Sequence, residues 1–189
     1  MIEKIVFKKN IRPKDYKPYF ERKSIENQKA SQSVKEIIKN VRNRKDEALK
    51  EYTLQFDHVD LASLGIKVGK AEIKNATKEV EKEFLEALSF AVERITLFHE
   101  KIIPTSWAEE DVEGNFWGQI VKPIERVGVY VPGGTASYPS SVLMNIIPAQ
   151  IAGVEEIAVC IPPDKNGNIN KYVLAALDFV KEYEVYRVG

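Results

Sequence analysis

The fold is decided by residues 126–139, which read Arg-Val-Gly-Val-Tyr-Val-Pro-Gly-Gly-Thr-Ala-Ser-Tyr-Pro. An apolar run at 127–131 is bounded by turn-forming residues, which is typical of a strand buried in a parallel sheet. A Pro-Gly-Gly turn at 132–134 follows, and a helical pattern then covers about residues 140–152 and is closed by Gly153. The stretch therefore predicts a strand, a glycine-rich turn and a helix.

Three further segments continue this alternation along the chain. Residues 157–161 are predicted as a second apolar strand, 172–180 as a helix and 185–188 as a third strand. Such alternation predicts an α/β fold in which residues 123–189 form the first half of a Rossmann-like parallel sheet. Because no helix follows the last strand, we interpret the chain as a fragment. The alternative is that this strand is a true edge and that the helical region covers the other face of the sheet.

The first part of the chain has a different character. Residues 1–30 carry mixed charges and two prolines, and we expect them to form an N-terminal arm. Residues 31–122 are predicted as the mostly helical part of a first α/β domain, with a loop at 57–65, an extended segment at 66–68 and a strand at 116–121. The apolar residues at helical spacing are Val34, Ile37, Ile38, Val41, Phe84, Leu85, Leu88, Val92, Ile95 and Phe98.

Composition excludes several classes of protein. With 44% hydrophobic residues among 189, the chain can bury a core, so global disorder is not expected. Lys plus Arg and Asp plus Glu number 28 each, which removes the simplest argument for binding nucleic acid. No apolar run approaches the roughly 18 residues of a membrane span, and the start of the chain lacks a secretory core. A single cysteine suits a reducing compartment, so we expect a cytoplasmic protein.

The turn at Gly133 and Gly134 is the first candidate for chemistry. Backbone amides and a helix dipole at such a turn can receive an anion. The turn is not the G-x-G-x-x-G fingerprint, and no acidic residue follows at the spacing of a ribose ligand, so a structural tight turn explains it as well as a cofactor contact does. Tyr130 ends the preceding strand, where it can enter the crevice that binds cofactors. The alternative is a tyrosine packed within the sheet.

Other polar side chains point to structural roles. Ser140 and Ser141 open the predicted helix and are expected as N-caps, since no histidine nearby in sequence can activate them as nucleophiles. His58 and His99 are isolated from each other, and Cys160 is expected in the core. These three side chains do not form the ligand set of a catalytic zinc. We therefore predict no catalytic and no metal-binding residue in this sequence.

Residues 126–134 closely resemble a signature of the histidinol dehydrogenase family. The resemblance continues through Ser-Ser-Val-Leu-Met at 140–144 and Ile-Pro-Ala-Gln-Ile-Ala-Gly at 147–153. Shorter helical pieces, such as Asp-Glu-Ala-Leu at 46–49, occur in the family's order, so the resemblance covers roughly residues 33–189. The match around the Pro-Gly-Gly turn is its specific part.

This resemblance implies a fold, an activity and partners. The family has an α/β fold of the aldehyde dehydrogenase class, with incomplete Rossmann-like halves. Its members oxidise L-histidinol through bound L-histidinal to L-histidine with two NAD molecules, at the end of histidine biosynthesis. They bind zinc and form intertwined homodimers. The resemblance thus implies an NAD- and zinc-dependent oxidoreductase with L-histidinol as its substrate and no nucleic-acid or membrane partner.

The resemblance also implies site residues. Tyr130 matches the family's tyrosine that contacts NAD, and Pro132, Gly133 and Gly134 match the adjoining turn. Residues 137–138 depart from the family, which usually has a smaller, proline-bearing apolar pair there. The zinc ligands and the Glu-His acid/base pair belong to the later half of the family's chain and have no match here. We therefore expect the isolated chain to be inactive.

Two other classes of function remain open from the sequence. One keeps the fold but is an NAD(P)-dependent aldehyde or acyl-phosphate reductase, which needs a catalytic cysteine; Cys160, inside a predicted strand, is a poor candidate. The other is a non-catalytic module that binds a nucleotide or a partner chain.

Overall fold

The computed structural model describes residues 28–133, 137–181 and 183–189, which fall into two compact units, Met1–Asn43 and Arg44–Gly189. Helix α2 (Gln28–Arg44) makes up nearly all of the described part of the first unit. It has the predicted amphipathic pattern, with Val34 and other apolar side chains largely exposed. The predicted arm at residues 1–30 lies outside the described residues except for its last three.

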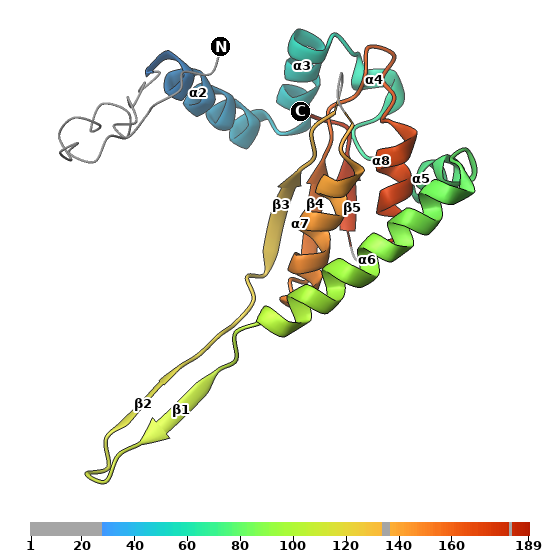
Figure 1. The fold of residues 1–189 in the computed structure, drawn as a ribbon. Helices are drawn as coiled ribbons and strands as arrows, with labels where there is room; N and C mark the ends of the chain where they lie inside the picture. The colour runs from blue at the N-terminus through green and yellow to red at the C-terminus, as the bar shows by residue number, and fades with distance from the viewer. Residues whose placement is uncertain (1–27, 134–136, 182) are drawn as a thin grey trace, which may run out of the picture. The chain divides into compact units, whose positions relative to one another are not determined.

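A three-stranded parallel sheet is the centre of the second unit. Strands β3 (Arg126–Tyr130), β4 (Glu156–Cys160) and β5 (Tyr183–Tyr186) lie in the order β3-β4-β5, so β4 is the middle strand (Figure 1). Residues 66–68 run antiparallel beside β5, because the Val68 N–H donates to the Val185 carbonyl. The predicted α/β fold with a parallel sheet is confirmed, although the third strand begins two residues earlier than expected.

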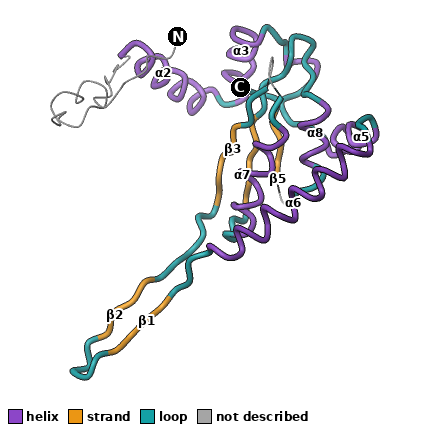
Figure 2. The backbone as a smooth tube through the Cα atoms, in the orientation of Figure 1, coloured by secondary structure: helices purple, strands orange, loops and turns teal. Residues whose placement is uncertain are grey.

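Helices cover one face of this sheet in two layers (Figure 2). Helices α7 (Pro139–Ile151) and α8 (Lys171–Leu177) connect the strands and pack against each other. Outside them, α6 (Lys82–Ile102) packs on α7 and α5 (Lys70–Lys78) packs on α8. The helices of the predicted helical region therefore complete the core of the sheet. None of the helices in the described ranges has the length and apolar character needed to cross a bilayer.

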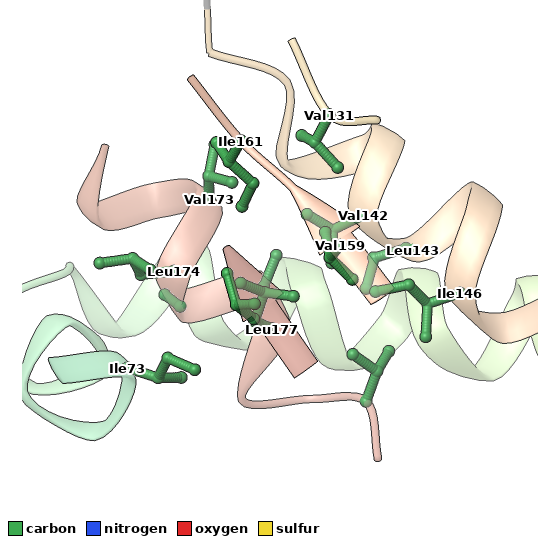
Figure 3. Packing of buried hydrophobic residues seen from close by; sticks show 14 of the residues in the cluster. Ile73, Val131, Val142, Leu143, Ile146, Val159, Ile161, Val173, Leu174 and Leu177 are labelled. Carbon is green, nitrogen blue, oxygen red and sulfur yellow. The ribbon is translucent and has the colours of Figure 1, made fainter. Parts of the chain in front are cut away.

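The main core lies between the sheet and these helices. Along β3 and β4, side chains alternate between the two faces, so Val129, Ile157 and Val159 are buried while their neighbours are not. Each such aliphatic side chain contributes about 1.5–3 kcal/mol when fully buried. Figure 3 shows how side chains from the sheet and helices interdigitate. Its labelled members are Ile73, Val131, Val142, Leu143, Ile146, Val159, Ile161, Val173, Leu174 and Leu177.

The opposite face of the sheet is covered at one end only. A second cluster lies over the carboxyl ends of β4 and β5 and includes residues next to α3 (Asp46–Asp57) and in α4 (Leu61–Leu64). Helix α4 is a short helix inside the region predicted as a loop, and its N-cap is Asp60, whose carboxylate accepts a bond from the Ala62 N–H. The members of the cluster are Val59, Leu61, Ile66 and Val188, with Leu49, Cys160 and Tyr186 packed against them.

A two-stranded antiparallel hairpin extends from the amino end of β3 (Figure 1). It consists of β1 (Trp107–Glu110) and β2 (Phe116–Gln119), joined by a turn in which Gly114 has a φ of 84°. The Asp111 carboxylate accepts bonds from the backbone N–H groups of Glu113 and Asn115, which fixes the turn. Every residue of both strands is exposed. The sequence predicted β2 and missed β1.

One local expectation at the start of α7 was wrong. Neither Ser140 nor Ser141 is the N-cap, because the helix begins at Pro139 with Tyr138 as its N-cap residue. Proline at the first helical position loses no helical hydrogen bond there, so it sets the start of the helix. The predicted end is confirmed: α7 stops at Ile151, and Gly153 has the left-handed φ of 83° that favours glycine.

Candidate functional site

The candidate site is the edge at which the parallel strands end, the place where open α/β sheets bind ligands. Tyr130 is the last residue of β3 and lies in register with Cys160, which in turn pairs with Tyr186. The sheet continues one residue further, because the Val131 N–H donates to the Cys160 carbonyl over 3.0 Å. Since Val129 and Val131 point into the core, Tyr130 lies on the opposite face. Its side chain is 56% exposed, so it is not a tyrosine packed within the sheet.

The turn after β3 contacts the turn after β4. A Cβ placed on Gly133 would lie 2.4 Å from the carbonyl oxygen of Pro162 and 3.1 Å from its Cγ. A residue with a side chain fits there only if the backbone shifts. The close contact alone therefore explains why this position is a glycine, without a ligand. Pro132 is half-buried beside it. Gly134, the fourth predicted cofactor contact, lies outside the described residues.

The amino end of α7 follows this turn. The helix is 13 residues long, has no acidic residue in its first turn and has no side-chain N-cap bond. A helix of this length places a partial positive charge at its amino end, although Pro139 has no N–H group and the Ser141 N–H donates to the Tyr138 carbonyl over 2.9 Å. The order of strand, glycine-containing turn and helix is the one found in sites that bind phosphate or another anion, but residues 134–136 of this turn lie outside the described residues.

A third segment brings an acidic residue to the same edge. A Cβ placed on Gly189 would lie 3.2 Å from the Pro162 Cβ and 3.4 Å from the Asp57 Oδ2. Asp57 is the last residue of α3, and His58, which follows it, has a left-handed φ of 60° that ends the helix. Burial raises the pKa of the Asp57 carboxyl, an effect that the neighbouring His58 opposes. Local sequence patterns do not predict this placement, because Asp57 and the strand ends are far apart along the chain.

Cys160 lies between the two tyrosines and is half-buried. Burial raises the pKa of its thiol, so the thiol stays protonated near neutral pH and is a poor nucleophile. The Tyr186 hydroxyl donates to a Glu184 carboxylate oxygen over 2.7 Å. Cys160 is therefore a poor candidate for covalent catalysis at this edge.

Metal ligands do not come together in the part of the chain that the structure describes. Within residues 28–133, 137–181 and 183–189, no group of three or more His, Cys, Asp or Glu side chains is placed to hold a metal ion. His58 is exposed at the end of α3, and His99 lies in the last turn of α6. The described residues thus contain no set of zinc ligands.

Comparison with known proteins identifies the family. Residues 20–189 match the histidinol dehydrogenase family. A histidinol dehydrogenase of Caldanaerobacter subterraneus subsp. tengcongensis is 47% identical over 189 residues, which are 100% of this chain and 44% of that protein. One from Listeria innocua is 49% identical over 156 residues, 82% of this chain and 36% of that protein.

A solved structure agrees with these relatives. The crystal structure of histidinol dehydrogenase from Elizabethkingia anophelis matches with a TM-score of 0.78 and 36% identity, over 84% of this chain and 36% of that one. The chain thus spans less than half the length of the curated relatives that it matches. Because the family match extends over most of the sequence and the relatives are nearly half identical, the chain belongs to the histidinol dehydrogenase family.

Proposed function

We propose that this chain is the amino-terminal part of an NAD- and zinc-dependent dehydrogenase that oxidises L-histidinol through L-histidinal to L-histidine, in the cytoplasm, as a homodimer. The family match over residues 20–189 carries this proposal. It is supported by two features of the strand ends: the Tyr130 ring is exposed, and Gly133 is in close contact with the turn after β4.

Within that enzyme, residues 123–189 are proposed to be the first half of the NAD-binding domain and residues 31–122 the mostly helical part of a first α/β domain. Tyr130 offers an exposed aromatic ring at the edge of the sheet, which can pack against a planar ring of the cofactor. Gly133, next to Pro132, lets the turn after β3 lie close to the turn after β4. The sequence predicts that Gly134 continues this turn. The amino end of α7 can receive the charge of the pyrophosphate.

The chemistry itself is assigned to parts of the enzyme outside this chain. When bound, NAD supplies the hydride acceptor and zinc polarises the substrate alcohol. The described residues do not include a zinc-binding set, and the only cysteine has a raised pKa. What this chain contributes is the binding and orientation of the dinucleotide at the carboxyl ends of its strands.

The proposed activity is tested with a chimera. Residues 1–189 replace the matching part of the Caldanaerobacter relative, which is 47% identical over that length. We expect the purified chimera to reduce NAD with L-histidinol and to support growth of a histidine auxotroph without histidine. A folded chimera that does not oxidise L-histidinol, beside an active unmodified relative, would contradict the proposal.

The isolated chain provides the complementary test. Purified residues 1–189 are expected to show no L-histidinol oxidation, with or without added zinc, because the zinc ligands and the acid/base pair are assigned elsewhere. Turnover above that of a heat-denatured sample would mean that this chain contains the catalytic residues after all.

A further inference from the structure

One ion pair joins two segments of the second unit that are far apart in the sequence. The side chain of Arg187, directly after β5, is 6% exposed, and its Nη2 donates to the Glu72 Oε1 over 2.5 Å. Glu72 lies in the first turn of α5, 115 positions earlier in the chain. Arginine is almost never buried without a partner, because removing its charge from water is costly. The pair therefore fixes the start of α5 to the end of β5.

The segment that this pair attaches is residues 66–78, which we call the strap. It comprises the extended piece beside β5 and helix α5. Among the described residues, two backbone hydrogen bonds join it to β5: Val68 N–H to the Val185 carbonyl, and Arg187 N–H to the Ile66 carbonyl. Helix α5 adds two buried side chains, Ile73 and Ala76. A segment with so few buried groups opens at a lower free energy than a core helix such as α7.

The charges of the strap make the two partners of the ion pair unequal. The strap has one acidic residue, Glu72, and four lysines: Lys67, Lys70, Lys74 and Lys78. Without the Glu72 charge, a buried guanidinium would lie against a cationic segment, which is strongly unfavourable. Without Arg187, the remaining Glu72 side chain is 38% exposed and can be hydrated. Loss of the more exposed partner is therefore expected to do the greater damage.

We propose that the Arg187–Glu72 pair is a clamp that keeps the strap on the sheet, and that the strap opens as a unit, separately from the rest of the core, when Glu72 loses its charge by substitution. The inference does not depend on the proposed NAD site. An open strap leaves the outer side of β5 unpaired, because residues 66–68 are the segment that runs beside it. Unpaired strand edges of this kind associate with other chains.

The second ion pair of the strap provides a matched control. Lys67 and Glu184 also join the strap to β5, but their side chains are 61% and 45% exposed. Exposed pairs contribute little to stability. In the variant K67M, moreover, Glu184 keeps the hydrogen bond from the Tyr186 hydroxyl, so no buried charge is left alone.

The test is hydrogen exchange, followed by mass spectrometry, of purified residues 1–189 and of the variants E72Q, R187M, R187M/E72Q and K67M. Glutamine preserves the shape of Glu72 and removes its charge, and methionine is an unbranched apolar replacement for arginine. The strap amides report local opening, and the amides of α7 report opening of the main core. The double variant shows whether removing the buried charge relieves the effect of E72Q.

We expect E72Q to speed exchange of the strap amides by at least about tenfold, while α7 exchanges as in the wild type. R187M and the double variant should speed it less than E72Q, and K67M should match the wild type. Equal effects of E72Q and K67M, or equal acceleration in the strap and α7, would overturn the clamp. If E72Q alone does not fold, a folded double variant supports the proposal and an unfolded one contradicts it.

Discussion

The parallel sheet and the β1–β2 hairpin are both rich in large apolar side chains, yet they place them in opposite environments. In the sheet, Val129 and Val159 face α7 and α8 and are almost fully buried. In the hairpin, Phe116 is 73% exposed, and Trp107 and Trp117 are about half exposed. Within the described residues, packing accounts for the apolar side chains of the sheet but not for those of the hairpin. A two-stranded ribbon on its own is only marginally stable.

The edge at which the parallel strands end contains residues of both kinds: some that packing explains, as in the sheet, and some that are exposed, as in the hairpin. Gly133 resembles the core, because its contact with Pro162 alone requires a glycine. Tyr130 resembles the hairpin, since packing among the described residues does not account for its exposed ring. An exposed aromatic ring of this kind is available to pack against a ligand or a partner surface.

The largest expected difference is between truncations in the two regions. L143A removes a side chain that is 1% exposed in α7, and we expect it to lower the free energy of unfolding by about 2–5 kcal/mol. F116A, on the hairpin, should change it by no more than about 0.5 kcal/mol. Urea denaturation of both variants measures the contrast. Similar losses in the two variants would show that the hairpin is buried against something in solution.

Alanine substitutions at two glycines are expected to change the free energy of unfolding by an intermediate amount and to differ clearly from each other. G133A forces a methyl group against the Pro162 carbonyl and is expected to destabilise the protein by about 1–3 kcal/mol. G128A is the control in the same segment, because a Cβ there meets nothing within 4 Å, and its effect should stay within about 0.5 kcal/mol. Equal stability of the two variants in chemical denaturation would contradict the close contact between the two turns.

The smallest expected effect concerns alkaline pH. Burial raises the pKa of Tyr183 to about 12, and its hydroxyl donates to the Leu177 carbonyl over 2.7 Å. Because the folded pKa is above the unfolded value near 10, the stability that this group adds is complete below about pH 10 and is lost as the pH rises toward 12. Y183F should cost about 1 kcal/mol at pH 8 and reduce this alkaline loss. Denaturation series at several pH values test this, and an identical pH dependence in Y183F would refute it.

The sequence predicted well those parts of the fold that local patterns determine. The apolar run ending at Tyr130, the turn after it and the helix closed by Gly153 follow from residue types and spacing alone. The start of α7 was mispredicted, because serine is a common N-cap residue whereas here Pro139 at the first helical position sets the start. Strand β1 was missed since its sequence, Trp-Ala-Glu-Glu, lacks the alternation of a half-buried strand.

The candidate site was predictable only in part. The family resemblance predicts that Tyr130, Pro132, Gly133 and Gly134 contact NAD, and this stays a prediction. The close approach of Asp57 to Gly189 was not predicted, because it depends on how α3 packs at the carboxyl ends of β4 and β5. Such long-range placement is set by the whole core and leaves no trace in local sequence.

The measurement that tests the central claim most directly is a titration of NAD into residues 1–189 carrying Y130A or F116A. Both substitutions remove an exposed aromatic side chain, one at the strand ends and one on the hairpin, so neither should disturb folding. If the strand ends bind the dinucleotide, Y130A weakens NAD binding about tenfold and F116A leaves it unchanged. Binding that Y130A leaves intact, or that F116A weakens equally, would contradict a nucleotide site at this edge.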